Sequence, residues 1–258
     1  MTKPFQTRVT RRRFGRTAGC ALASLALGDA CLVESSTSSE SDGRLTARPP
    51  DRVVTSLASG ALGLGGGGRD GVVQVPAAAA KGPVPLLVFL HGATQNGEGM
   101  LRRIGAAADQ AGVAVLAPDS RGTTWDAIRE GFGDDVRFLD RALAHVFARL
   151  AIDPARMALG GFSDGASYAI SLGLANGDLF PRVTAFSPGF VISAKPNGRP
   201  RFFISHGTSD RILPIDRCSR VIVPRLQSMG YDVTFREFEG RHEMPPDVAR
   251  EGLQWLAR

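Results

Sequence analysis

Short, nearly continuous apolar runs alternate with amphipathic helical patterns along this chain, and that alternation constrains the fold more than any other feature. The apolar runs are 86–90, 113–117, 157–159, 183–186 and 202–204. The helical patterns are 100–111, 134–150, 164–175, 215–229 and 246–256. Apolar runs without a polar face are typical of strands that are buried on both faces of a parallel sheet. The sequence therefore predicts an α/β fold with a doubly wound, mostly parallel sheet.

The region ahead of the first apolar run, residues 52–75, has a weaker pattern. β-prone pieces flank a glycine-rich run from Gly63 to Gly71, where we expect a hairpin or loop that joins two edge strands. The glycines at 65–68 lack the Lys-Ser/Thr ending that a phosphate-binding loop requires. No Cys/His spacing in the sequence suits zinc. We therefore expect neither a cofactor nor a metal.

Positive charge is concentrated at the start of the chain, which carries a formal net charge of +6. The basic residues that precede the first acidic one are Lys3, Arg8, Arg11, Arg12, Arg13 and Arg16. The rest of the chain is electrically balanced, which argues against a nucleic-acid partner. The apolar segment 17–27 that follows is too short to span a bilayer as a helix, but it has the length of a signal-peptide core. Residues 10–16, T-R-R-R-F-G-R, resemble a twin-arginine export signal.

The composition predicts three parts: an export signal over 1–31, a flexible Ser/Thr-rich linker over 32–50 and a folded domain over 51–258, to which the motifs described next assign catalysis. The signal ends in Gly28-Asp29-Ala30-Cys31, which fits either an ordinary small-residue cleavage site or a degenerate lipoprotein box. We slightly favour the box, with a lipid anchor on Cys31, although Gly28 and Asp29 depart from its usual form. The expected destination is the bacterial periplasm, in free or membrane-anchored form. Removal of the signal would discard Cys20, so if Cys31 carries lipid, Cys218 has no disulfide partner.

Residues 161–165, G-F-S-D-G, match the G-x-S-x-G pattern of a nucleophile elbow. In such an elbow, small flanking residues permit a tight strand-to-helix turn that presents the serine hydroxyl. The apolar run 157–159 lies before the pattern and a helical segment follows it. The sequence therefore predicts Ser163 as a nucleophile.

A serine nucleophile needs a base within hydrogen-bonding reach and an acid that orients the base. In α/β folds with this elbow the chain order is serine, acid, histidine. Two histidines follow Ser163. His206 directly follows a strand, which favours a hydrogen-bonding role at the strand end. His242 lies in a loop after the expected strand 233–238 and before the last helix, so we assign the base to His242.

Asp210, in the loop after the strand 202–204, is the predicted triad acid. Its rival, Asp216, lies at the start of the next helix, where a carboxylate commonly caps amide groups. The negative charge that grows on an attacked carbonyl oxygen needs backbone donors. We expect these to be the amides of Asp164 and of Ala93, with Thr94 as the next choice. His91, which comes shortly before Ala93 in the chain, is interpreted as a loop-bracing residue.

Four segments in order resemble the phospholipase/carboxylesterase branch of the α/β-hydrolase superfamily, from about Leu86 to Leu256. They are Leu90-His91-Gly92, the elbow 161–165, His206-Gly207-Thr208-Ser209-Asp210 with Pro214, and His242-Glu243-Met244-Pro245-Pro246. The resemblance implies ester chemistry on an α/β-hydrolase fold. Two departures concern the substrate: Asp164 stands where that branch often has Gln, and residues 91–95, H-G-A-T-Q, resemble polyhydroxybutyrate depolymerase and feruloyl-esterase relatives.

The sequence thus predicts a serine esterase that acts on a small-molecule or surface-presented ester. The stretch between Ser187 and Arg201 is too short for a large cap domain, which implies an exposed site. The alternatives are a secreted polyester depolymerase or a feruloyl-type esterase and, from another class, a non-catalytic exported binding protein that retains the fold. Trp125 and Phe190 fit either an acyl or aryl pocket or simple packing.

Overall fold

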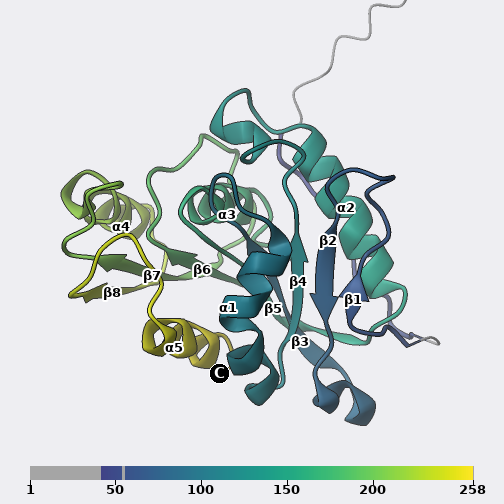
Figure 1. Cartoon of the computed structure of the whole chain (residues 1–258). Coiled ribbons are helices and arrows are strands. Elements are labelled where there is room, and N and C mark those ends of the chain that lie inside the picture. The colour runs from purple at the N-terminus through teal and green to yellow at the C-terminus, as the bar shows by residue number, and fades with distance from the viewer. Residues whose placement is uncertain (1–41, 54–55, 258) are drawn as a thin grey trace, which may run out of the picture. The chain divides into compact units, whose positions relative to one another are not determined.

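Strands that lie far apart in the sequence form one sheet in the order β1-β2-β4-β3-β5-β6-β7-β8. The computed structural model describes residues 42–53 and 56–257 (Figure 1). The strands are β1 (Gly60–Ala61), β2 (Gly71–Gln74), β3 (Val84–Leu90), β4 (Ala114–Pro118), β5 (Ile152–Phe162), β6 (Arg182–Phe186), β7 (Arg201–Gly207) and β8 (Val233–Phe238). All pairings from β4 through β8 are parallel, whereas β1 and β2 pair antiparallel at one edge. The predicted parallel sheet and its edge hairpin are confirmed.

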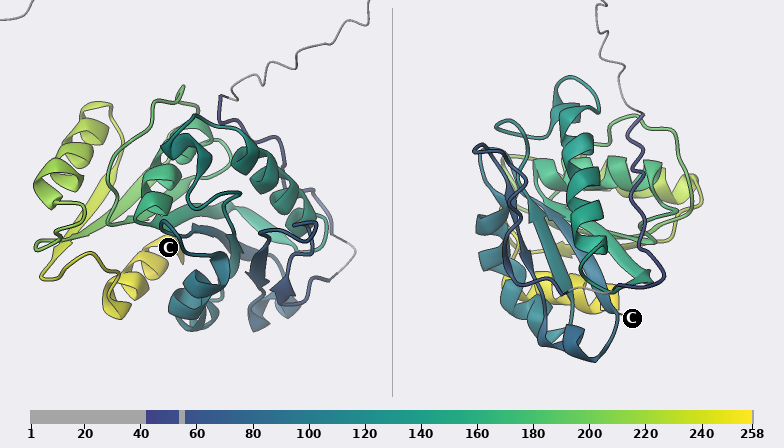
Figure 2. Two further views of the ribbon diagram at one scale, coloured as in Figure 1. Left: turned by 45° about the horizontal axis from the view of Figure 1, so that its top comes forward. Right: turned by 90° about the vertical axis from the view of Figure 1, so that its right-hand side faces the viewer.

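Helices cover both faces of the sheet (Figure 2). They are α1 (Gly97–Gln110), α2 (Asp134–Phe147), α3 (Asp164–Ala175), α4 (Ser219–Ser228) and α5 (Pro246–Ala257). One apolar cluster contains Met100 of α1 and Leu253 of α5, and a second, on the other face, contains side chains of α2, α3 and α4. The sheet is therefore doubly wound, as the alternation of patterns predicts.

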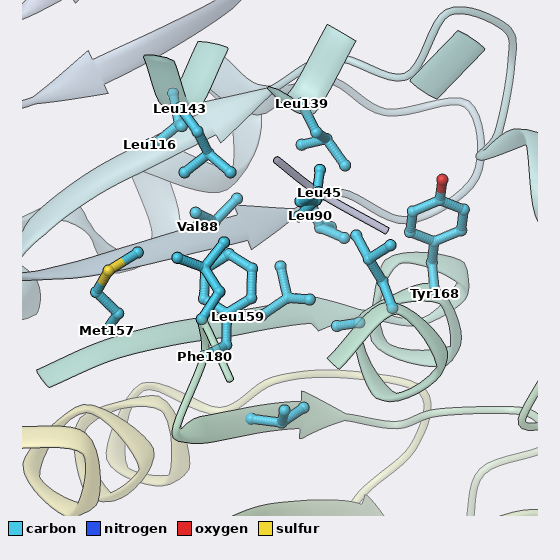
Figure 3. Packing of buried hydrophobic residues seen from close by; sticks show 14 of the residues in the cluster. Leu45, Val88, Leu90, Leu116, Leu139, Leu143, Met157, Leu159, Tyr168 and Phe180 are labelled. Atoms are coloured by element: carbon cyan, nitrogen blue, oxygen red, sulfur yellow. The ribbon is translucent and has the colours of Figure 1, made fainter. Parts of the chain in front are cut away.

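The core between the sheet and α2 and α3 is built from the apolar runs of the central strands. Val88 of β3 and Leu159 of β5 are each 1% exposed and pack with Leu139 and Leu143 of α2 (Figure 3). Strands β3, β4 and β6 have almost no exposed residues, which explains why their sequences carry no polar alternation.

The prediction of one continuous helix over 215–229 is wrong at its start. The segment begins with a 3-10 turn, Ile215–Arg217, and α4 starts only at Ser219. At Cys218 the backbone leaves the helical region, with φ −116° and ψ −101°. The next hydroxyl, Ser219 Oγ, lies 2.7 Å from His206 Nδ1, so this break aims a side chain at the end of β7.

Part of the expected flexible linker packs against the folded domain. Leu45 is 2% exposed, and its amide donates to Asn176 Oδ1 at 2.8 Å. Arg44 forms an ion pair with Asp178 at 2.9 Å. The buried leucine and the paired arginine extend the folded region ahead of the expected boundary at residue 51. The predicted signal and Cys31 lie outside the described residues.

None of the helices in the described part of the chain combines the length and apolar character that crossing a membrane requires. The connection from β6 to β7, residues 187–200, contains neither a helix nor a strand. This connection therefore adds no large cap domain to the sheet.

Candidate active site

The predicted catalytic residues come from loops at the carboxyl ends of parallel strands. In a doubly wound sheet these ends meet at one edge, where ligands bind. Strand β3 leads into residues 91–96, which we call the oxyanion loop. Strand β5 leads into Ser163, strand β7 into Asp210, and strand β8 into His242. The topology thus brings segments that are far apart in the sequence to one place.

Ser163 lies at a strained turn between β5 and α3, with φ 57° and ψ −121°. A non-glycine residue rarely adopts a positive φ, and such strain is concentrated at functional sites. The flanking glycines permit the turn. A Cβ on Gly161 would lie 2.4 Å from the carbonyl carbon of Gly165, and a Cβ on Gly165 would lie 2.3 Å from the carbonyl oxygen of Leu90. Both positions therefore require glycine, as the elbow pattern predicts.

Ser163, His242 and Asp210 form a continuous hydrogen-bonded chain. Ser163 Oγ lies 2.8 Å from His242 Nε2, and His242 Nδ1 lies 2.6 Å from Asp210 Oδ2. An ionised carboxylate can only accept, so Nδ1 carries the proton and Nε2 is left to accept the serine hydroxyl. The three predicted residues have the arrangement that activates a serine.

The carboxylate of Asp210 is held by backbone amides of its own loop. Oδ1 accepts from Ile212 N at 2.9 Å and from Leu213 N at 2.8 Å, and the side chain is fully buried. Burial alone would raise the pKa of Asp210, but the Leu213 amide and His242 outweigh it and the net pKa is lowered. Asp210 is therefore ionised at neutral pH.

The loop that carries His242 is fixed from three sides. The ring of Phe162 packs against the imidazole with a centroid separation of 5.0 Å. Ser209 N donates to Gly240 O at 2.9 Å, and Ser187 Oγ donates to Glu243 O at 3.3 Å. The side chain of His242 is 10% exposed, so one edge of the imidazole stays accessible to solvent.

The oxyanion loop lies beside the nucleophile, since a Cβ on Gly92 would be 3.3 Å from Ser163 Cβ. The amide of Thr94 already donates to Thr123 O at 2.7 Å, whereas no acceptor for the amide of Ala93 is found among the described residues. Asp164 is the first residue of α3, where an amide has no acceptor within the helix. The amides of Ala93 and Asp164 are therefore free of acceptors among the described residues, unlike the amide of Thr94, and the oxyanion role of the two amides stays a prediction.

His91 is completely buried and braces the oxyanion loop. Its Nε2 accepts from Ser120 N at 2.9 Å, its Nδ1 lies 2.7 Å from Gly92 O, and its carbonyl oxygen accepts from Trp125 Nε1 at 2.8 Å. Burial lowers the pKa of His91, so the ring is neutral near pH 7. The sequence interpretation of His91 as a bracing residue agrees with these contacts.

The other candidates from the sequence are neither the base nor the acid of the hydrogen-bonded chain, although His206 Nε2 lies 3.2 Å from Asp210 Oδ2 and so backs the acid. His206 is buried, with Nδ1 2.7 Å from Ser219 Oγ and Nε2 2.8 Å from Leu213 O, which is a strand-end role. The rival acid Asp216 is exposed and pairs with Arg220 at 2.7 Å. It therefore does not serve as the acid partner of His242.

Trp125 and Phe190, the two candidate pocket residues, have different surroundings. Trp125 is 1% exposed and packs between the rings of His91 and Tyr168, at centroid separations of 4.9 and 5.2 Å. It is a packing residue. Phe190 is 41% exposed in the loop after β6, and Ile212, in the loop that carries Asp210, is 71% exposed.

Two supporting hydroxyls have no motif in the sequence that would identify them. Thr124 Oγ1 donates to Asp164 Oδ2 at 2.6 Å, which ties the loop after β4 to the start of α3. Ser167 Oγ accepts from Gly189 N at 2.9 Å and so holds the loop after β6. Over residues 42–53 and 56–257, no group of three or more His, Cys, Asp or Glu side chains is arranged to hold a metal.

Comparisons with known proteins point to one family. The profile of a family described as Phospholipase/Carboxylesterase matches residues 123–256. Acyl-protein thioesterase 1 of Aspergillus fumigatus is 31% identical over 112 residues, which cover 40% of this chain and 46% of that protein. NocK of Nocardia uniformis is 29% identical over 146 residues, which cover 52% of this chain and 42% of that protein. The chain thus matches less than half the length of these two curated relatives.

The likeness to solved structures concerns the fold. The crystal structure of esterase PE8 superposes with a TM-score of 0.60, covering 73% of this chain and 98% of that chain at 23% identity. The superposition covers nearly all of that esterase.

Proposed function

The chain belongs to the phospholipase/carboxylesterase family of α/β-hydrolases, and from this premise we propose that it is a serine esterase that cleaves carboxylic esters through an acyl-enzyme. The observation that carries the proposal is the hydrogen-bonded chain from Ser163 through His242 to Asp210, beside the amides of Ala93 and Asp164. Each of these groups has a role in acyl transfer, and the strained turn at Ser163 favours catalysis over mere retention of the fold, because such strain is concentrated at functional sites.

In the first step, Ser163 Oγ attacks the ester carbonyl while His242 Nε2 takes the hydroxyl proton. Asp210 keeps the imidazole in the required tautomer and stabilises its positive charge. The amides of Ala93 and Asp164 donate to the oxyanion of the tetrahedral intermediate. His242 then returns the proton to the alcohol oxygen as the C–O bond breaks, which leaves the acyl group on Ser163.

In the second step, a water molecule replaces the alcohol. His242 Nε2 takes one proton from this water, and the resulting hydroxide attacks the acyl carbonyl. The second tetrahedral intermediate collapses with loss of Ser163 Oγ, which recovers the proton from His242. The carboxylic acid leaves and the free enzyme is restored.

The surroundings of the site support a small or surface-presented ester with an apolar part. The loop over residues 187–200 offers little cover, and the exposed side chains of Phe190 and Ile212 belong to the loops after β6 and β7. Where exposed apolar side chains form a patch beside a reactive centre, the patch commonly contacts a ligand or a partner surface. The same exposure favours the second candidate, a polyester depolymerase or feruloyl-type esterase.

A substrate panel tests the proposal. The full chain is assayed with short p-nitrophenyl esters, lysophospholipid, an aryl ester such as ethyl ferulate and a polyester film, in parallel with Ser163→Ala. We expect wild type to hydrolyse at least the p-nitrophenyl esters and Ser163→Ala to lose that activity. Release of soluble products from the film would favour the second candidate. Folded wild-type protein that hydrolyses none of these esters would contradict the esterase proposal.

The charge pattern ahead of the folded domain supports a proposal on location. We propose export through the twin-arginine-like segment, with Cys31 as the site of a lipid anchor in the periplasm. Mass spectrometry of the mature N-terminus tests it: a lipid-modified Cys31 is the expected result. A free Leu32 or an unmodified Cys31 would exclude the anchor.

A further inference from the structure

Arg69, in the glycine-rich loop before β2, reaches the oxyanion loop. Its Nη2 donates to Gln95 O at 2.7 Å and lies 3.2 Å from His91 Nε2. Its Nε donates to Ser120 O at 2.6 Å. One guanidinium therefore contacts both ends of the oxyanion loop and the loop that follows β4, although it lies outside the stretch that the family profile matches.

The glycine-rich loop is built to hold Arg69 in this place. Gly66 and Gly67 have φ of 59° and 89°, which turn the chain in a way that larger residues rarely adopt. The carboxylate of Asp70 accepts from Gly63 N at 2.8 Å and from Leu64 N at 3.0 Å. Asp119 N donates to Asp70 O at 3.0 Å, so the residue next to Arg69 is anchored to the end of β4. The glycine run, which lacks the motif of a phosphate-binding loop, thus has a structural role.

The contacts of Arg69 bracket the predicted oxyanion donor. No hydrogen-bond acceptor for the amide of Ala93 is found in the described part of the chain, so its position depends on the residues on either side. On one side, His91 is fixed by Ser120 N and faces Arg69; on the other, the carbonyl of Gln95 accepts from Arg69. A planar guanidinium presents its donors in a rigid fork that is pre-organised to hold two such groups, whereas an ammonium presents three donors on a flexible stem.

We propose that Arg69 is a positioning residue that sets the aim of the Ala93 amide at the oxyanion by fixing both ends of the oxyanion loop. The proposal rests on the serine-esterase function. Removal of Arg69 leaves the triad intact but lets the oxyanion donor drift. Misplacement by about 1 Å can cost on the order of 100-fold in rate. Loss of a whole oxyanion donor costs about 100- to 1,000-fold in kcat.

The experiment compares Arg69→Ala, Arg69→Lys and Arg69→Gln with wild type on a p-nitrophenyl ester. We expect Arg69→Ala to lower kcat by about 10- to 100-fold with KM changed by less than about 3-fold, because the oxyanion forms only during the reaction. The rate of labelling by a fluorophosphonate should fall by a similar factor. Added methylguanidine should partly restore Arg69→Ala, and Arg69→Lys should not regain the wild-type kcat.

Arg44→Ala is the matched control. Arg44 also binds a backbone carbonyl, that of Ala175, and a carboxylate, that of Asp178, but it lies away from the triad loops. Its loss should lower the melting temperature and leave kcat unchanged. If Arg69→Gln and Arg69→Ala, confirmed as folded by their melting transitions, keep the wild-type kcat and labelling rate, the inference is overturned. An increase in KM alone would also overturn it.

The outcome for wild type separates this inference from the function on which it rests. If wild type reacts with the fluorophosphonate and the Arg69 variants react equally fast, only the proposed role of Arg69 is contradicted. If folded wild type neither reacts with the probe nor hydrolyses the ester, the esterase proposal is contradicted, and the proposed role of Arg69 with it.

Discussion

Within the site, the acid on the triad side and the oxyanion loop on the other side are held in place by different kinds of contact. On the triad side, Asp210 is fixed by amides two and three residues further along its own loop. On the oxyanion side, the contacts join residues far apart in the sequence: Arg69 with Gln95, and His91 with Ser120. Local contacts leave a compact motif in the sequence, whereas long-range contacts leave none. The two sides should therefore respond differently to mutation.

The largest effect is expected on the triad side, from Asp210→Asn. Asparagine keeps the size of the side chain and an oxygen for the loop amides, but it no longer stabilises the His242 imidazolium or its tautomer. We expect kcat to fall by about 1,000- to 10,000-fold with little change in KM, as in other serine triads. Steady-state kinetics on a p-nitrophenyl ester measure this.

The rival carboxylate provides the control for that prediction. Asp216→Asn removes an exposed charge that pairs with Arg220, so its kcat should stay within about two-fold of wild type. A larger loss for Asp216→Asn than for Asp210→Asn would reassign the acid. If Asp210→Asn also has a melting temperature close to that of wild type, a change on the triad side lowers activity without lowering stability.

On the oxyanion side, activity and stability should fall together. His91→Ala removes a fully buried ring that packs on Trp125 and leaves the amide of Ser120 without its acceptor. We expect about 2–4 kcal/mol lower unfolding free energy, from the cavity and the unmade hydrogen bond. We also expect a 10- to 100-fold lower kcat from the displaced loop. Urea unfolding and steady-state kinetics on the same preparation test whether stability and kcat fall together. A destabilised His91→Ala with the wild-type kcat would contradict this prediction.

A smaller effect, on pH dependence, is common to both sides. Burial lowers the pKa of His91 and also that of His206. Unfolded histidine titrates near pH 6.5, so as the pH falls below that value the unfolded state binds protons that the folded state does not. Each of the two histidines should therefore lower the unfolding free energy on acidification, by at most about 1.4 kcal/mol per pH unit.

Asp135 acts in the opposite direction over part of this range. Burial raises its pKa to about 6, so below that pH the folded state binds a proton before the unfolded state does, and this contribution stabilises the fold as the pH falls. Urea unfolding at pH 7.5 and 5.5 measures the net slope. His91→Gln and His206→Gln should each lose less stability between these pH values than wild type; a slope as steep as that of wild type would contradict neutral buried histidines.

The sheet, the triad and the elbow glycines follow from patterns that the sequence displays directly. Apolar runs mark the buried strands. A place in a loop, as against a strand end or a helix start, selects His242 over His206 and Asp210 over Asp216. The break at Cys218 and the packing of Leu45 depend on contacts with residues such as His206 and Asn176, which the local sequence does not reveal. Arg69 lies in a glycine-rich loop of weak pattern, and only the folded chain brings it to Gln95.

The central claim is that Ser163 is a nucleophile activated by His242. Intact-mass spectrometry after incubation with a fluorophosphonate, followed by peptide mapping, tests it most directly. The account predicts one phosphonyl adduct on wild type, located on Ser163, and no adduct on folded Ser163→Ala. An adduct on Ser163→Ala, or no adduct on folded wild type, would contradict it.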